Sequence, residues 1–439
     1  MRRTIGKKYE VAIAFMLPLL AAVVIVTSKV KYTGSDPRGS LVVAESILRN
    51  KTIKLDQYDS NYLKDLGFRI HQKADHSYYY FPLGTSVLSV PVVAVANVIG
   101  MEMVRSEHRV QLILTILTAM LIIAMLYRLA RLFLEPGNAA LASGLFWGGT
   151  SFASISGTAL WSHNLATLFA LIAIDLAIRD ARAEHSRSWG WIGLCLFLAY
   201  FCRPTLSLLS PFLLLFLFAH HRLAAVKASL MLVALLGGFV AFSYHEFGQV
   251  LPSYYLPTRV SRTSHFATAV YGNLFSPARG LLVFSPFLVA VWLCARRAPE
   301  LFRLNPLWWG IGLAWPVLHL IVISRFPNWW AGWSYGPRLM MDVLPGLFLL
   351  TLRAWPTEFN TQRLRIGAAI LAMTAVCALF AHTYQGLYNR YSHHWNAEPA
   401  IDQNPRYLFD WKYPQFLHDQ KRHQARLQEY GATPRIPGR

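Results

Sequence analysis

The chain has 439 residues, of which 54% are apolar and only 15% charged, and its formal net charge is +20 at pH 7. The apolar residues cluster in blocks that are long enough to cross ~30 Å of hydrocarbon, which excludes an ordinary soluble domain. The Lys and Arg residues lie in short runs between these blocks and no nucleic-acid-binding module is visible, so we expect no nucleic-acid partner.

The apolar blocks predict an all-α polytopic membrane protein with about eleven transmembrane helices, within a range of about ten to twelve. The first block, at 9–28, follows a basic N-terminus and is not closed by a small-residue cleavage site. We therefore interpret it as a retained span rather than a signal peptide. The others lie at 109–127, 139–158, 164–178, 189–202, 205–219, 228–245, 280–295, 307–324, 338–352 and 366–385.

The segment Phe81–Gly100 decides the topology, because it is long and apolar enough to cross but is interrupted by Pro82, Gly84 and Pro91. If it stays at the interface or re-enters, the basic residues of the short loops share the side of the N-terminus. These residues are Arg128, Arg131, Arg179, Arg182, Arg187, Arg222, Lys227, Arg296, Arg297, Arg303, Arg353, Arg363 and Arg365. The positive-inside rule favours this arrangement over a crossing segment.

That topology predicts a multi-pass protein of the inner (cytoplasmic) membrane, with its N-terminus in the cytoplasm. The transmembrane domain would occupy 1–385, and its large first outer loop at 28–108 would contain interfacial helices. An extracytoplasmic tail would follow at 386–439. This tail contains Trp395 and Trp411, so we expect it to pack against the outer loops.

Asp36 lies just beyond the outer end of the first span, before the amphipathic stretch Gly39–Arg49. A carboxylate at this depth could act as the general base that deprotonates an acceptor hydroxyl next to a lipid-anchored phosphate. The alternative is that Asp36 N-caps the following helix, with Pro37 at its first position. The two roles are compatible with each other.

Two arginines at the outer ends of spans are candidates for binding a phosphate. Arg203 precedes Pro204 between two apolar runs, where a cation is costly unless it pairs or serves an anionic ligand. Arg338 opens a later apolar helix, and Asp342, one turn further, could bind with it at the site or form a structural ion pair. A guanidinium suits phosphate because it donates paired hydrogen bonds. Further outer candidates are Arg259, Arg262 and Arg279.

His163, in the predicted outer turn between the third and fourth spans, could share acid/base work with Asp36, although a lone loop histidine is more often solvated. Tyr335 ends an aromatic cluster that could stack on sugar rings. For Trp329 and Trp330 in the same cluster, an interfacial belt is the expected role. The sequence contains no Cys/His cluster that predicts a metal site.

The order of these residues resembles that of the GT-C superfamily of membrane glycosyltransferases, which includes the aminoarabinose transferases of lipid A and the protein O-mannosyltransferases. In that family an Asp follows the first span in a large outer loop with interfacial helices, as Asp36 does here. A basic residue before a Pro-Thr break, here Arg203, approaches the carrier phosphate. The chain departs from the family at His163, where members usually have a second acidic residue.

The resemblance implies an inverting glycosyltransferase that takes a sugar from a polyprenyl-phosphate carrier in the membrane lipid. The acceptor would be a lipid, a glycan or a protein on the extracytoplasmic face, and a divalent cation is left open as a cofactor. The alternatives are a transporter or flippase, or a polymerase or ligase, of lipid-linked glycans. A transporter would require polar residues through several spans and paired halves with internal symmetry, and the sequence has neither pattern.

Overall fold

The computed structural model describes residues 2–260, 265–294, 307–355 and 362–431, and it divides into two compact units. Unit 1 comprises Met1–Val30, Ile123–Thr158 and Arg259–Arg439, and unit 2 comprises Lys31–Ile122 and Ala159–Thr258. The predicted inner-loop residues Arg296, Arg297 and Arg303 and the outer candidate Arg262 lie outside the described residues.

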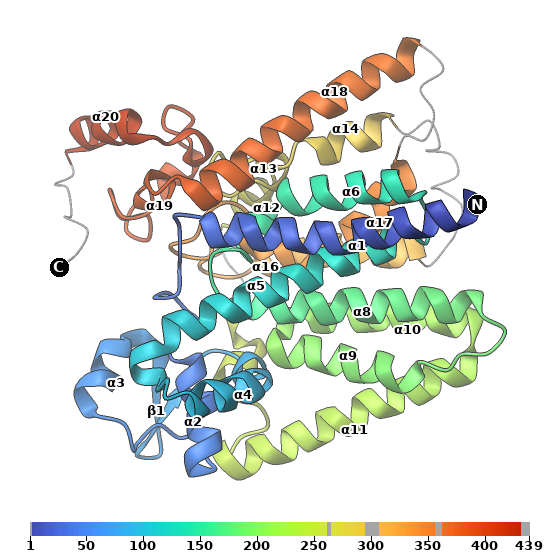
Figure 1. Cartoon of the computed structure of the whole chain (residues 1–439). Helices are drawn as coiled ribbons and strands as arrows, with labels where there is room; N and C mark the ends of the chain where they lie inside the picture. Colours follow the sequence, from blue (N-terminus) through green and yellow to red (C-terminus); the bar gives the residue numbers. More distant parts are fainter. Residues whose placement is uncertain (1, 261–264, 295–306, 356–361, 432–439) are drawn as a thin grey trace. The chain divides into compact units, whose positions relative to one another are not determined.

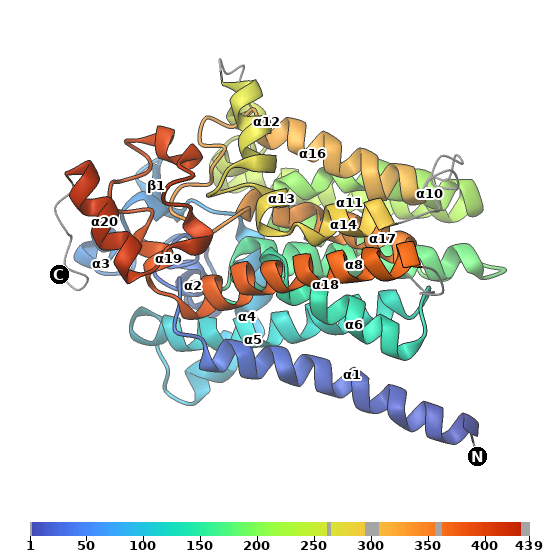
Figure 2. The same ribbon diagram turned by 90° about the horizontal axis from the view of Figure 1, so that it is seen from above.

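Unit 2 combines a group of long helices with a compact structure formed by the first predicted loop (Figures 1 and 2). The long helices are α8 (Ser162–Arg182), α9 (Trp189–Cys202), α10 (Leu209–His220) and α11 (Arg222–Phe247), with the 3-10 turns η2 (Pro204–Leu208) and η3 (Ser253–Tyr255). The loop structure consists of α2 (Ser40–Asn50), α3 (Ser60–Leu66), η1 (Gly67–Arg69), β1 (Ile70–Lys73), β2 (His76–Tyr79) and α4 (Leu83–Val98). The helix α5 (Met103–Ala130) follows it and continues into unit 1.

The strands β1 and β2 form an antiparallel hairpin in which Ile70 is opposite Tyr79 and Lys73 is opposite His76. Ala74 and Asp75 both have positive φ at its turn. Two successive residues of this kind match the right-handed twist of a two-residue hairpin. The strictly all-α prediction is therefore wrong for this loop, although the remaining described structure of unit 2 is helical.

The helix α4, which covers most of the segment that decides the topology, packs against α2 and against the ends of longer helices. Val93 and Ala96 join a buried cluster with Val110 and Leu114 near the start of α5. At its first turn, a Cβ on Gly84 would lie 2.5 Å from the backbone nitrogen of Cys202, the last residue of α9. Whether α4 lies at the membrane interface or crosses the membrane stays a prediction.

Unit 1 begins with α1 (Arg2–Thr27) and later contains α6 (Pro136–Gly148), α7 (Ser151–Ser154), α12 (Phe266–Phe275), α13 (Leu281–Phe284) and α14 (Phe287–Cys294). The 3-10 turn η4 (Pro257–Arg259) contains the point in the chain where unit 2 ends and unit 1 resumes. Three further helices combine two geometries: the π-helical η5 (Leu307–Ala314) with α16 (Trp315–Ile323), the 3-10 η6 (Arg338–Val343) with α17 (Leu344–Ala354), and α18 (Gln362–Leu379) with the π-helical η7 (Phe380–Tyr388). The tail forms α19 (Tyr391–His394), η8 (Pro405–Phe409), η9 (Gln415–Leu417) and α20 (Gln420–Tyr430).

Within the described residues, four helices are long and apolar enough to cross a membrane, at Glu10–Thr27, Met103–Ala130, Arg222–Phe247 and Arg365–Tyr388. Shorter apolar helices lie at Leu83–Val98, Trp189–Cys202, Pro204–His220 and Leu307–Ile323. These helices support the prediction of a multi-pass membrane protein. The number of eleven spans and the orientation of the termini remain predictions.

The C-terminal tail is folded against other parts of unit 1, as its aromatic residues predicted. Trp395 is fully buried and its Nε1 donates to the carbonyl oxygen of Tyr413 at 2.7 Å. Trp329 and Trp330 join the same buried cluster, and Trp330 Nε1 donates to Asp402 Oδ1 at 2.8 Å. The expectation that these two tryptophans form an interfacial belt is wrong, because the tail covers them.

Candidate functional site

The loop that carries Asp36 connects α1 to α2 and is partly buried in unit 2. The helix α2 begins at Ser40, and its N-cap is Gly39 with φ 95°. Asp36 lies three residues earlier, so the alternative in which it caps this helix from the first position before Pro37 is wrong. The free N–H groups at the start of α2 bind another side chain, which is described next.

The cap of α2 is the buried carboxylate of Glu107, from the second turn of α5. Its oxygens accept hydrogen bonds from the backbone N–H of Gly39 at 2.8 and 2.9 Å and of Leu41 at 3.0 Å. In return, Glu45 Oε1 of α2 accepts from the backbone N–H of Met103, the first residue of α5, at 3.2 Å. Each helix thus supplies a carboxylate to the positive end of the other, which fixes α2 on α5.

The backbone of the Asp36 loop is held by three side chains from later parts of unit 2. Arg69 donates to the carbonyl oxygens of Ser35 at 2.8 Å and Gly34 at 2.5 Å. The hydroxyl of Tyr79 donates to the carbonyl oxygen of Asp36 at 2.5 Å, and Gln111 Nε2 donates to that of Pro37 at 3.2 Å. These bonds all end on main-chain atoms, so they fix the backbone of the loop that carries the Asp36 side chain.

Three basic residues, Arg69, Arg38 and Lys31, are part of the electrostatic environment of this loop. Burial lowers the pKa of Arg69, nearby Arg38 lowers it further, and the charge of Asp36 acts in the opposite direction. Burial also lowers the pKa of Lys31, five residues before Asp36, to about 8. The charges of Asp36 and Arg69 therefore interact within this loop.

Arg203 is buried at the C-terminal end of α9, where the backbone turns extended before Pro204. Its Nη1 lies 3.5 Å from the hydroxyl of Tyr254, in η3. The ring of Tyr254 packs against Phe81 at 5.7 Å, and Phe81 packs against Tyr79, also at 5.7 Å. Because Tyr79 bonds to the Asp36 loop, a short chain of contacts joins the surroundings of Asp36 and Arg203.

His163 is fully buried in the first turn of α8, so the expectation of a solvated loop histidine is wrong. The neighbouring Trp161 packs edge-on against Tyr32 at 6.0 Å, at the start of the Asp36 loop. His163 therefore belongs to the same end of unit 2 as Asp36. A catalytic role shared by the two residues remains a prediction.

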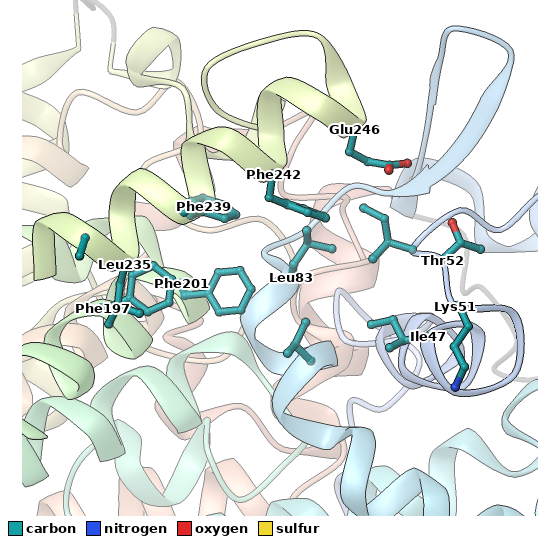
Figure 3. A pocket seen from close by; sticks show the side chains of 14 residues that line it. Ile47, Lys51, Thr52, Leu83, Phe197, Phe201, Leu235, Phe239, Phe242 and Glu246 are labelled. Atoms are coloured by element: carbon teal, nitrogen blue, oxygen red, sulfur yellow. The ribbon is translucent and has the colours of Figure 1, made fainter. Parts of the chain in front are cut away.

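An apolar groove of about 710 Å³ lies close to Arg203, between α2, α4, α9 and α11 (Figure 3). The aromatic side chains of Phe197, Phe201, Phe239 and Phe242 line much of it, and Glu246, Lys51 and Thr52 lie toward one end. Tyr255 connects its wall to the Arg203 region, because its ring packs on Phe239 at 5.0 Å and its hydroxyl donates to the carbonyl oxygen of Phe201 at 2.6 Å.

The remaining predicted site residues lie in unit 1. Arg338 is buried at the start of η6, with Nη1 3.5 Å from the carbonyl oxygen of Ala331. Asp342, in the next turn, lies with Oδ2 3.9 Å from Nε2 of buried His319. Tyr335 packs in the core, and its hydroxyl donates to the carbonyl oxygen of Ala381. The core contacts of Tyr335 account for it structurally, and substrate binding by these three residues stays a prediction.

Arg279, one of the further outer candidates, is a structural residue of unit 1. Its guanidinium donates to Asn396 Oδ1 and Gln415 Oε1, both at 2.7 Å, and to three carbonyl oxygens, including those of Trp330 and Gly332. Burial lowers its pKa to about 9. With its donors engaged in this way, Arg279 joins the tail to the preceding loop.

The described residues contain no group of three or more His, Cys, Asp or Glu side chains arranged to hold a metal ion. The positioning residues Glu107, Arg69 and Tyr79 were not singled out from the sequence. The sequence contains a weak signal for Glu107, because a glutamate near the end of a membrane-spanning helix is energetically costly unless it has hydrogen-bond or charge partners.

The fold is similar to those of two solved membrane proteins. It matches ArnT from Cupriavidus metallidurans, crystallised with undecaprenyl phosphate, with a TM-score of 0.53 and 14% sequence identity, covering 95% of this chain and 75% of that chain. It matches the Archaeoglobus fulgidus oligosaccharyltransferase in the apo form with a TM-score of 0.50 and 14% identity, covering 90% of this chain and 59% of that chain. The chain has a GT-C fold.

Sequence comparison adds a partial match to this GT-C fold. Residues 89–245 match the family model of dolichyl-phosphate-mannose-protein mannosyltransferase, over α4, α5 and the helices from α6 to α11. No curated protein sequence matches the chain. The GT-C resemblance deduced from the residue order is confirmed by these matches.

Proposed function

We propose that the protein transfers a sugar from a polyprenyl-phosphate carrier to an acceptor on the extracytoplasmic face of the membrane. The observation that carries the proposal is the proximity, at one end of unit 2, of a positioned carboxylate, a buried arginine and an apolar groove. These are the three elements that a reaction between a hydroxyl acceptor and a lipid-anchored sugar phosphate requires.

In this mechanism Asp36 is the general base. It would remove the proton of the acceptor hydroxyl as the oxygen forms a bond to the anomeric carbon. The bond from that carbon to the phosphate oxygen would break on the opposite face, which inverts the configuration. The products would be the glycosylated acceptor and the polyprenyl phosphate, with the proton on Asp36. The backbone anchors on the Asp36 loop support this role, because a base acts efficiently only from a fixed position.

Arg203 would bind the carrier phosphate and stabilise its charge as it leaves, because a guanidinium binds phosphate through charge-assisted hydrogen bonds. The groove lined by Phe197, Phe201, Phe239 and Phe242 would hold part of the isoprenoid chain through van der Waals packing, because a chain that leaves lipid gains no hydrophobic transfer energy. Arg338 remains a second predicted phosphate ligand, and its own substitution tests that role.

The main test is mass spectrometry of glycolipids and glycans from cells that lack the gene and are complemented with variants. We expect Asp36→Asn to be produced and folded but to leave the glycan profile of the deletion strain unchanged. The matched control is Asp75→Asn, an exposed position with positive φ in the hairpin turn, where Asn is equally suitable. Full complementation by Asp36→Asn would remove Asp36 from the mechanism.

The donor is tested separately with undecaprenyl phosphate as the probe. Arg203→Ala should weaken its binding by about tenfold to a hundredfold, since hydrogen bonds to charged groups contribute about 1.5–3 kcal/mol. Arg187→Ala, which removes an exposed arginine from the α8–α9 loop, should have no effect. Unchanged affinity in Arg203→Ala would return Arg203 to a purely structural role.

A further inference from the structure

A second cavity in unit 2, of about 340 Å³, lies at the other end of its long helices. It is lined by residues of the α8–α9 connection, including His185 and Ser186, and by His221, Arg222 and Lys227 around the start of α11. No carboxylate is among the described residues that line it. The cavity therefore combines a hollow of the size of a phosphate-containing headgroup with a concentration of basic side chains.

The walls of this cavity are organised by the protein itself. The carboxylate of Asp180 accepts hydrogen bonds from the backbone N–H of Ser188 at 2.9 Å and its hydroxyl at 3.0 Å, and from the hydroxyl of Ser186. His221 Nε2 lies 2.9 Å from the carbonyl oxygen of Asp180, which ties the start of α11 to the end of α8. Asp180 is thus engaged in shaping the connection, and the exposed Glu184 is the other acidic residue of this loop.

The cationic groups stand beside apolar surface. Lys227 Nζ lies 5.6 Å from the ring centre of Trp189, so its charge is held at the cavity wall. On the outer surface of α11, Leu223 is 67% exposed and Leu230 is 63% exposed. A phosphate with acyl chains attached can contact both kinds of surface at once, whereas a soluble anion uses only the cations. The apolar surface next to the cavity favours a lipid.

The depth of the cavity also fits a lipid headgroup. Lys227 and Glu246, which lines the groove near Arg203, are 19 residues apart on α11, which corresponds to about 28 Å along the helix. This separation is close to the ~30 Å thickness of the hydrocarbon core. The two cavities therefore lie near opposite surfaces of the membrane, and the second one is separate from the proposed transfer site.

We propose that the cavity between the α8–α9 connection and the start of α11 binds the phosphate of an anionic phospholipid, with Arg222 and Lys227 as its principal ligands. The lipid would occupy the membrane surface opposite to the Asp36 end of unit 2. Basic pockets between membrane helices commonly recognise anionic headgroups, and each cation near the surface adds to the attraction. This site is independent of the donor and acceptor of the proposed reaction.

The test is native mass spectrometry of the full chain in detergent, titrated with phosphatidylglycerol or phosphatidylcholine. We expect preferential retention of phosphatidylglycerol, and an affinity about thirtyfold lower in the double variant Arg222→Gln/Lys227→Gln, which removes two charges worth about 1 kcal/mol each at the surface. The charge-matched control, Arg182→Gln/Arg187→Gln, changes two exposed arginines near the cavity that do not line it and should keep most of the binding.

Two further arms complete the experiment. The charge-conserving variant Arg222→Lys/Lys227→Arg should retain the preference for phosphatidylglycerol, which separates loss of charge from loss of folding. Inorganic phosphate at millimolar concentration should not displace the lipid. Equal retention of both lipids, equal losses in the two neutralised variants, or displacement by inorganic phosphate would each overturn the proposal.

Discussion

The carboxylate of Glu107 offers the sharpest test of how the Asp36 loop is positioned. It is buried and accepts hydrogen bonds from two backbone N–H groups at the start of α2. In Glu107→Gln, an amide oxygen at the Oε1 position can still accept from both N–H groups, but the negative charge is lost and the NH₂ group at the Oε2 position turns a donor toward the N–H of Gly39. Hydrogen bonds to a charged acceptor contribute about 1.5–3 kcal/mol and neutral ones about 0.5–1.5 kcal/mol, so the substitution weakens this cap, and it also leaves the buried NH₂ group facing another donor.

We therefore expect Glu107→Gln to reduce the free energy of unfolding by about 2–4 kcal/mol, to which the lost interaction with the helix dipole contributes. Sugar transfer should fall as well, because the loop between Asp36 and α2 loses its anchor. Unfolding is measured by SDS titration in mixed micelles, and transfer by complementation of the deletion strain. The cavity left by Glu107→Ala should make both losses larger.

The matched control is Glu102→Gln, just before α5. The side chain of Glu102 is 56% exposed and lies 3.9 Å from Arg49, and an exposed pair of this kind contributes little to stability. The reasoning predicts a clear difference between the two glutamine variants. If both unfold at the same SDS fraction and complement equally well, the capping interaction does not hold the loop.

Three other predictions concern packing and pH. In Gly84→Ala the new Cβ would meet the backbone of Phe201 and Cys202 at 2.5–2.6 Å, so we expect a loss of about 1–3 kcal/mol in SDS unfolding, whereas Gly237→Ala has open space and should be neutral or stabilising. Burial, with Arg426 and His423 nearby, lowers the pKa of His418 to about 2, so below pH 6.5 the unfolded tail takes up a proton that the folded tail does not. The free energy of unfolding should therefore decrease as the pH is lowered, by about 2 kcal/mol at pH 5. At that pH an acid-tolerant protease should cleave the tail of the unsubstituted protein faster than the tail of His418→Gln. Arg279→Lys should lose its bonds to Asn396 and Gln415 and make the tail several-fold more sensitive to trypsin at pH 7.5, while exposed Arg406→Lys should not.

The features that could be predicted from the sequence depend on local composition. Apolar runs identify the helices because span length is set by the bilayer, and the aromatic residues of the tail indicated that it packs. Asp36 and Arg203 stand out because a charge at a span end requires a reason. Their common location at one end of unit 2 follows from the alternating direction of consecutive spans.

The features that could not be predicted depend on partners distant in sequence. The start of α2 at Ser40 is set by Glu107, and nothing near Asp36 announces that contact. His163 looks like a solvated turn residue until the first turn of α8 buries it, and Trp329 looks interfacial until the tail covers it. Both errors have the same cause, because the local sequence does not show which later segment will cover a polar or aromatic side chain.

The exchange of carboxylates between α2 and α5 imposes an order on biosynthesis. Gly39 and its acceptor Glu107 are 68 residues apart, and the chain is made from its N-terminus. While only α1 and the nascent loop have left the ribosome, Glu107 is not yet available to cap the first turn of α2. Glu45 likewise lacks the N–H of Met103, from which it accepts a hydrogen bond in the folded protein. The loop that holds Asp36 can reach its final conformation only after the start of α5 has been translated and delivered to the same side of the membrane.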